Sequence, residues 1–94
     1  MIVFKAKTAE ELEIEMEERS KEICIDICKS VCDALDSDVD KVIIGVIESF
    51  GTELVASKEG FLFCLKENFE RIEQAEEYEL CVRSKKWIEK LETK

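Results

Sequence analysis

The side chains whose spacing comes closest to a reactive or metal-binding arrangement are cysteines. Cys24, Cys28 and Cys32 recur every four residues and would lie along one stripe of a helix, while Cys64 and Cys81 stand apart. A ladder of thiolates could hold a soft metal ion, but zinc sites usually use a Cys-x-x-Cys knuckle or paired loops, and this sequence has no Cys-x-x-Cys. Neighbouring isoleucines and a valine make the surroundings apolar, which raises the pKa of a thiol and leaves it inert. We expect small buried packing residues, with a metal or redox site as the alternative.

A second arrangement with metal-binding spacing is the acidic segment that contains Asp36, Asp38 and Asp40. Alternating aspartates open the calcium loop of an EF-hand, in which the sixth residue is Gly and the twelfth is Glu. Those positions hold Lys41 and Ile47. The sequence therefore predicts a solvated acidic connector and no metal site.

Other routes to catalysis lack their key residues. The chain has no His, which removes the commonest general base and the commonest metal ligand. A serine nucleophile would have only a Lys or a carboxylate as its base, and the 3 glycines are too isolated to form a phosphate-binding loop. We expect no catalytic residue, no cofactor and no small-molecule substrate.

The composition is that of a globular chain with a strong acidic excess. The 94 residues are 46% apolar and 39% charged, which suits one folded domain over residues 1–94. The formal charge of −9 repels phosphate backbones and anionic lipid, so we expect neither nucleic acid nor a membrane as a direct partner. An odd number of cysteines without a basic-then-apolar opening segment predicts a cytoplasmic protein with free thiols.

The elements that would position these residues begin with a strand and a long helix. Residues 2–7 alternate between apolar and polar, which predicts a half-buried strand. Thr8 and Glu11 form a capping box, and residues 8–35 then read as a single helix of about 28 residues without Gly or Pro. Its first half is too acidic to be buried, so we expect that half to project from the core or to meet a partner.

A hairpin follows the acidic connector. Residues 42–47 are β-branched and apolar on both faces, which predicts a central strand with Gly45 at a bulge or a close backbone approach. A turn at residues 50–52 leads to the return strand, residues 53–56. Ser57 stands where it can cap the next helix.

Two helices complete the chain, separated by a break in the pattern at residues 74–76. The second, residues 77–91, has an apolar side that we expect to be buried, made of Tyr78, Cys81, Val82, Ile88 and Leu91. The whole chain is predicted to be an α+β domain in the order β-α-β-β-α-α, with a small antiparallel sheet. Residues 1–57 would form its β-α-β-β core and residues 58–94 a helical hairpin.

Residues 65–92 read LKENFERIEQAEEYELCVRSKKWIEKLE. This segment resembles the UVR-type helical hairpin, which occurs in the B and C subunits of bacterial excision repair and in an activator of protein arginine kinase. The matching positions hold Leu65, Phe69, Glu77-Tyr78-Glu79, Cys81-Val82, Ile88 and Leu91-Glu92. Where the family has Leu followed by Arg-Asp, this chain has Ser84, Lys85 and Lys86. The resemblance implies a hairpin that packs against a second hairpin of the same or another protein, and it implies no catalytic residue.

Charge is distributed unevenly along the chain. Residues 1–57 carry 6 basic and 14 acidic side chains, whereas residues 58–94 carry 8 and 9. The helix that contains Lys85 and Lys86 is locally basic, so it could pair with the acidic half-helix around Glu13 and Glu17, either within one chain or between two copies. Two solvated faces that never meet are the alternative.

These features favour a small acidic, non-enzymatic protein–protein interaction module. It would self-associate as a homodimer or bind another protein through its helical hairpin, with Phe69, Tyr78 and Trp87 as anchors because aromatic residues dominate interface energetics. The second hypothesis is an acidic regulator or inhibitor, of the type found in phages and mobile elements. It would occupy the basic groove of a nucleic-acid enzyme through side chains such as Glu13 and Glu17.

Overall fold

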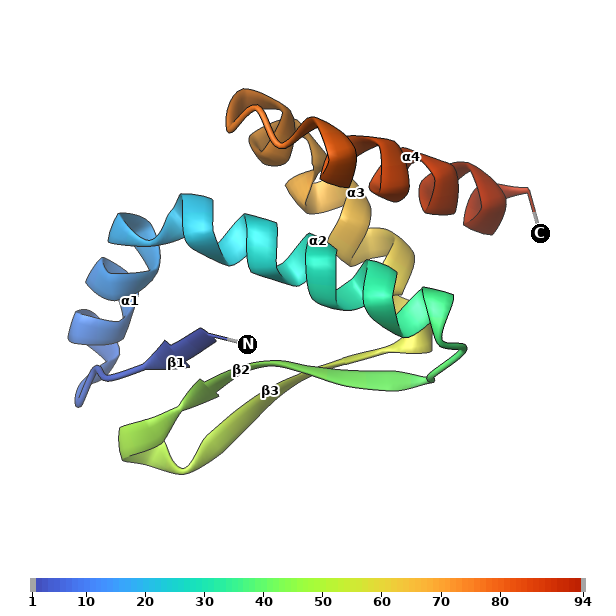
Figure 1. Ribbon diagram of the computed structural model, residues 1–94. Coiled ribbons are helices and arrows are strands. Elements are labelled where there is room, and N and C mark those ends of the chain that lie inside the picture. The colour runs from blue at the N-terminus through green and yellow to red at the C-terminus, as the bar shows by residue number, and fades with distance from the viewer. Residues whose placement is uncertain (1, 94) are drawn as a thin grey trace.

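A three-stranded sheet and four α-helices make up the fold, and the helices lie to one side of the sheet (Figure 1). The computed structural model describes residues 2–93. The predicted α+β class is confirmed, with the element order β-α-α-β-β-α-α. In chain order the elements are β1 (Ile2–Phe4), α1 (Ala9–Glu18), α2 (Ser20–Asp36), β2 (Lys41–Ile47), the 3-10 turn η1 (Glu48–Phe50), β3 (Thr52–Ser57), α3 (Lys58–Gln74) and α4 (Tyr78–Glu92).

The sheet is mixed, so the predicted antiparallel sheet is wrong for one of its two strand pairs. β2 lies between the other strands, antiparallel to β3 and parallel to β1, with Ile2 opposite Gly45 and Phe4 opposite Ile47. The tight hairpin turn, with Gly51 in the left-handed conformation at φ 62°, explains the antiparallel pair. The parallel pair arises because α1 and α2 form a crossover that returns the chain in its original direction.

The predicted single helix over residues 8–35 is broken at Arg19, and the prediction is wrong there. Arg19 has φ −104° and ψ 17°, so α1 ends and α2 begins at this residue. Its guanidinium reaches back to β1 and donates to the carbonyl of Val3 at 2.8 Å. This tertiary contact bends a stretch whose local sequence contains no helix breaker.

The start of α1 is capped as predicted. The backbone N–H of Glu11 donates to Thr8 Oγ1 at 3.1 Å, and the Glu11 carboxylate accepts from the N–H of Lys7 at 2.9 Å. No residue of α1 is buried, in agreement with the expectation that this half of the segment projects from the core.

The main core lies where α2, α3 and α4 meet over β2 and β3. Phe61, Leu65 and Ile72 of α3 are fully buried against α2. The α2 side of this contact is formed by small residues, which allow the two helices to approach closely: Cys24, Cys28, Val31 and Cys32. A smaller cluster of Ile2, Phe4 and Ile47 lies under the start of α2.

Gly45 allows β1 to lie close against β2. A Cβ atom at this position would stand 3.3 Å from the carbonyl oxygen of Ile2 and 3.4 Å from ring carbon Cε2 of Phe4. The pairing of β2 with β3 also shifts between Ile43 and Gly45, which leaves Ile44 as the additional residue of a β-bulge. Both features that the sequence predicted at Gly45 are therefore present.

β2 is the central strand of the sheet, as predicted, but one of its two apolar faces is not covered. Ile43 and its partner Val55 point to the face without helices and are 40% and 53% exposed. The opposite face of the sheet carries the buried residues, among them Ala56 and Ile47. The sequence pattern was compatible with a second covering layer, which this single chain does not supply.

The buried side of α4 agrees with the prediction only in part: Cys81 and Ile88 are half-buried against the core, as expected. Leu80 and Ser84 are buried, whereas Tyr78 and Val82 are 68% and 70% exposed. The rotation of α4 about its axis is set by polar contacts with α2, above all the 2.8 Å hydrogen bond from Trp87 Nε1 to Asp36 Oδ1. Over residues 2–93, no helix combines the length and the apolar character needed to cross a membrane.

Candidate functional site

The hairpin formed by α3 and α4 has an apolar groove on its solvent-facing side. Its floor consists of Phe69, Cys81, Val82 and Ile88, and its volume is about 530 Å³. We call this feature the hairpin groove. Charged residues of both signs form its edges: Lys66, Glu73, Lys85, Glu89 and Glu92.

Local backbone geometry and one ion pair hold the two walls of the groove together. At the closed end, Glu76 adopts a left-handed conformation with φ 60°, and the N–H of Glu77 donates to the carbonyl of Ile72 at 3.1 Å. At the open end, Lys66 Nζ lies 2.9 Å from Glu92 Oε2. The spacing between α3 and α4 is therefore constrained at both ends.

The predicted anchor residues are divided between two faces of the hairpin. Phe69 is partly buried and contributes to both the core and the groove floor. Lys85 lies at the edge of the groove, while Lys86 is exposed and does not line it. Tyr78 is exposed at the start of α4, also outside the groove. Trp87 faces α2, so the structure does not gather the three aromatic residues at one site.

Trp87 belongs to a polar cluster that joins α4 to the end of α2. Arg83 Nη2 donates to Asp33 Oδ1 and to Asp36 Oδ2, each at 2.8 Å, and Trp87 donates to the other Asp36 oxygen. Lys90 Nζ lies 4.8 Å from the centroid of the Trp87 ring, a cation–π distance. The Arg83 guanidinium, followed by the Trp87 indole N–H, lowers the pKa of Asp36 below its ordinary value.

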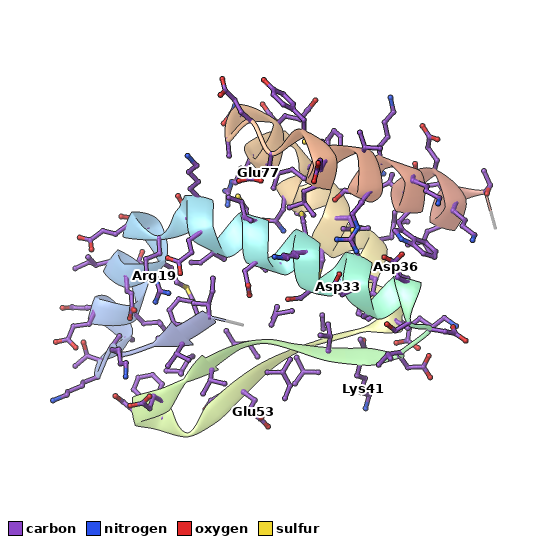
Figure 2. All side chains as sticks on the ribbon, in the orientation of Figure 1. Arg19, Asp33, Asp36, Lys41, Glu53 and Glu77 are labelled. Atoms are coloured by element: carbon purple, nitrogen blue, oxygen red, sulfur yellow. The ribbon has the colours of Figure 1, made fainter. Side chains whose placement is uncertain are left out.

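The acidic half-helix and the basic last helix do not meet within the chain. Glu13 and Glu17 are exposed on α1, at the opposite end of α2 from the polar cluster of α4 (Figure 1). Over the described residues, no ion pair joins α1 to α4. Arg83 pairs instead with Asp33 and Asp36, because these aspartates lie on the part of α2 that α4 crosses (Figure 2).

The cysteines are built into the core. Cys24, Cys28 and Cys32 have no exposed surface, and burial raises the pKa of each thiol, to about 12 for Cys28. The Cys24 thiol donates to the carbonyl of Lys21, and Cys32 Sγ lies 3.7 Å from the hydroxyl of buried Ser84. Within residues 2–93 there is no group of three or more His, Cys, Asp or Glu side chains placed to hold a metal ion.

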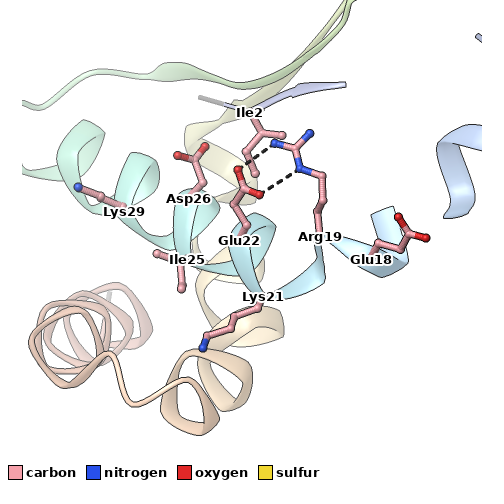
Figure 3. Close-up of a pocket in the computed structure, with 8 residues that line it drawn as sticks. All are labelled: Ile2, Glu18, Arg19, Lys21, Glu22, Ile25, Asp26 and Lys29. Carbon is pink, nitrogen blue, oxygen red and sulfur yellow. Dashed lines mark hydrogen bonds and ion pairs between the residues drawn. The ribbon is translucent and has the colours of Figure 1, made fainter. Parts of the chain in front are cut away.

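A second hollow, of similar volume at about 550 Å³, lies where α1 meets α2, and Arg19 is at its edge (Figure 3). Arg19 donates to Glu22 and to Glu15, and these two carboxylates raise its pKa further while the Arg19 guanidinium lowers that of Glu22. The guanidinium also lies 5.5 Å from the centroid of the Phe4 ring. These partners occupy Arg19, so it serves to join α1, α2 and β1. Sequence reasoning missed this role, although the helical spacing of Glu15, Arg19 and Glu22 was a visible signal.

A scan against protein-family models found no matching family, and searches of curated proteins and of solved structures found no similar protein. The UVR-type resemblance of residues 65–92 therefore stays a prediction. Among the described side chains, those of the hairpin groove combine an apolar floor with charges of both signs at its edges.

Proposed function

We propose that this chain is a small cytoplasmic, non-enzymatic interaction module that binds a helical segment of a protein partner in its hairpin groove. The observation that carries the proposal is the solvent-facing apolar floor between α3 and α4, where Val82 is 70% exposed. A contiguous apolar patch that stays exposed in the isolated fold is the kind of surface that a partner helix would bury.

The shape and charge of the groove favour a helix as its occupant. Two antiparallel helices leave between them a channel into which the apolar face of a third helix packs, as in helical bundles. Each wall of the groove carries one lysine and one glutamate, Lys66 and Glu73 on α3 and Lys85 and Glu89 on α4. This pattern of charges would fix the direction and register of the bound helix. The UVR-type resemblance points to the same use, since it implies packing against a second hairpin.

The test compares two exposed apolar residues of the same hairpin. Val82→Asp places a charge on the groove floor, while Phe63→Asp changes a residue that is 66% exposed on α3 and lies outside the groove. The wild-type chain and both variants are used for affinity capture from the native cell, and the mass of each complex is measured. We expect one stoichiometric partner, or a second copy, to be retained by wild type and Phe63→Asp and lost by Val82→Asp. Equal capture by all three chains would disprove the proposal.

One observation favours the second hypothesis, an acidic regulator that occupies a basic groove of a nucleic-acid enzyme. Glu13 and Glu17 stand on a helix without buried residues, and neither forms an ion pair with another described residue. Binding through this surface would weaken steeply between 0.01 M and 0.15 M salt, because the Debye length falls from about 30 Å to about 8 Å. Glu13→Gln with Glu17→Gln would weaken it as well, whereas binding in the hairpin groove would tolerate both changes.

A further inference from the structure

The face of the sheet that carries no helix is apolar at its centre. Ile43 of β2 lies opposite Val55 of β3, and both side chains are exposed, by 40% and 53%. Beyond the bulge, Val46 returns to the same face, where it lies opposite Val3 and is partly exposed. Sheets with one solvated face normally carry polar residues there. The side chains of Val3, Ile43, Val46 and Val55 are together called the outer sheet face.

A positively charged side chain lies at one end of this face and a negatively charged one at the other end. Lys41 begins β2, and Glu53 lies opposite Val46 near the hairpin turn, so the two are separated by the length of the strands. Both point away from α2 in Figure 2. Neither forms an ion pair with another described residue, whereas the nearby Lys5 and Glu48 pair with each other at 3.3 Å. Lys41 lies close enough to Glu59 to contribute to the lowered pKa of that carboxyl, after hydrogen bonds from the Glu59 backbone and Ser57 and the charge of Lys58. The outer sheet face thus has an apolar centre and a positive and a negative end.

We infer that the outer sheet face binds the same face of a second copy of this chain. Consider two copies related by a two-fold axis that lies between the sheets and is perpendicular to the strands. In this arrangement the positive end of each face meets the negative end of the other. That axis reverses the strand direction and places Lys41 of each copy near Glu53 of the other. An axis parallel to the strands would place like charges together, so electrostatics selects the first arrangement.

The area of the face sets the strength of the dimer. Strand rise and spacing give a footprint of about 20 by 14 Å for three short strands, or roughly 300 Å² per copy. A standard stable interface buries about 800 Å² per partner. The dimer is therefore weak and reversible, with a dissociation constant above the micromolar range, and it forms when the protein is concentrated.

This surface is separate from the hairpin groove. α2 and α3 lie between α4 and the sheet (Figure 1), and the groove and the outer sheet face share no residue. Variants of one surface leave the other unchanged. The failure of one proposal can therefore be distinguished from the failure of the other.

The first experiment removes apolar contacts and keeps the strand propensity. Threonine is close in shape to valine and is equally suited to a strand, so the double variant Ile43→Thr, Val55→Thr should keep its fold. Sedimentation equilibrium in 0.15 M salt, up to about 1 mM protein, should show a dimer for wild type and a dissociation constant raised about tenfold or more for the variant. Val39→Thr is the matched control, since Val39 is 48% exposed but lies outside the sheet.

The second experiment tests the orientation. Lys41→Glu and Glu53→Lys each create like charges at both ends of the dimer and should weaken self-association about tenfold. An equimolar mixture of the two single variants restores opposite charges at both ends, so it should form a heterodimer about as tight as the wild-type homodimer. The double variant should also recover wild-type association. Circular dichroism spectra confirm that each chain is folded.

Three results would overturn the inference. One is a wild-type chain that remains monomeric up to about 1 mM in 0.15 M salt. Another is a dimer that the threonine and charge variants leave unchanged. The third is a dimer that Val82→Asp dissociates and Ile43→Thr, Val55→Thr does not, which would assign self-association to the hairpin groove.

Discussion

At the scale of single residues, a few polar side chains decide how the last helix lies on the rest of the chain. Asp36 accepts hydrogen bonds from Arg83 and from the Trp87 indole, so one carboxylate joins the end of α2 to two consecutive turns of α4. A charge-assisted hydrogen bond is stronger than a neutral one, although this one is partly exposed and is weakened by solvent. The cluster therefore fixes the orientation of α4 more than it adds stability.

The hydrogen bonds to Asp36 make the free energy of unfolding depend on pH in the acidic range. Arg83 and Trp87 lower the pKa of Asp36 in the folded state, so its contribution is present above the unfolded-state pKa and is lost as the pH falls through the lower folded-state pKa. We expect Asp36→Asn to lower the free energy of unfolding at pH 7 and to flatten its decline below about pH 4. Urea denaturation between pH 7 and pH 3 measures both effects. Asp38→Asn is the control, because Asp38 lies in the following turn and forms no ion pair with another described residue; an equal effect of the two changes would contradict the assignment.

The buried thiols should be unreactive in the folded protein. Burial raises the pKa of Cys28 to about 12, so almost no thiolate forms at pH 8, and Cys24 and Cys32 are equally inaccessible. We expect a thiol reagent at pH 8 to label these three residues only as fast as the chain unfolds, and all five cysteines at once in denaturant. Labelling positions are read by mass spectrometry. Rapid modification of Cys28 in the native protein would favour the redox alternative.

At the scale of elements, the bend between α1 and α2 is the feature that shapes the N-terminal half. Arg19 ends one helix and begins the next, and it ties both to β1 through the carbonyl of Val3. Glu15 completes this junction, because its carboxylate accepts from the N–H groups of Lys5 and Ala6. α1 has no fully buried residue, so its position depends on these polar contacts together with half-buried Leu12, which packs against the cluster of Ile2, Phe4 and Ile47.

Reducing the number of hydrogen-bond donors at position 19 should loosen the junction between α1, α2 and β1. Arg19→Lys keeps the charge but cannot reach Val3 and both glutamates at once, because an ammonium lacks the planar fork of a guanidinium. We expect a loss of about 1–2 kcal/mol in stability and faster hydrogen exchange at Lys5 and Ala6. Lys21→Arg is the control, since Lys21 is an exposed residue of α2. Unchanged exchange at Lys5 and Ala6 would show that the bend does not depend on Arg19.

At the scale of the whole molecule, net charge opposes the association of two copies. Two chains of charge −9 about 25 Å apart repel by roughly 13 kcal/mol in unscreened water, and screening reduces this to about 6 kcal/mol at 0.01 M salt and below 1 kcal/mol at 0.15 M. The two pairs formed by Lys41 and Glu53 are worth at most about 1 kcal/mol each. General repulsion therefore outweighs the local attraction at low salt, and screening removes mainly the repulsion.

Self-association through the outer sheet face should consequently strengthen as salt rises from 0.01 M to 0.15 M. Sedimentation equilibrium at the two salt concentrations measures the change in the dissociation constant. This trend is opposite to that expected for an acidic surface bound to a basic groove, so one titration separates the two modes. A dimer that weakens over this range would show that local ion pairs dominate it.

Much of the fold could be predicted from the sequence because the interactions that form these elements join residues close together in the chain. Thr8 and Glu11 mark the start of α1 by a contact within one helical turn, and Gly51 marks the hairpin by its own backbone conformation. The last two helices follow from apolar residues at helical spacing. The missed features depend on partners far apart in the chain, such as Arg19 with Val3 and Trp87 with Asp36.

The sequence by itself determined the α+β class, the last two helices, the hairpin turn and the acidic character of the first half. These follow from periodicity, turn chemistry and charge, which act over a few residues. Only the tertiary structure decided the bend at Arg19, the parallel pairing of β1 and the side of α4 that is buried. It also showed that Ile43 and Val55 lie on an uncovered face, because burial depends on what packs above a strand and not on the strand alone.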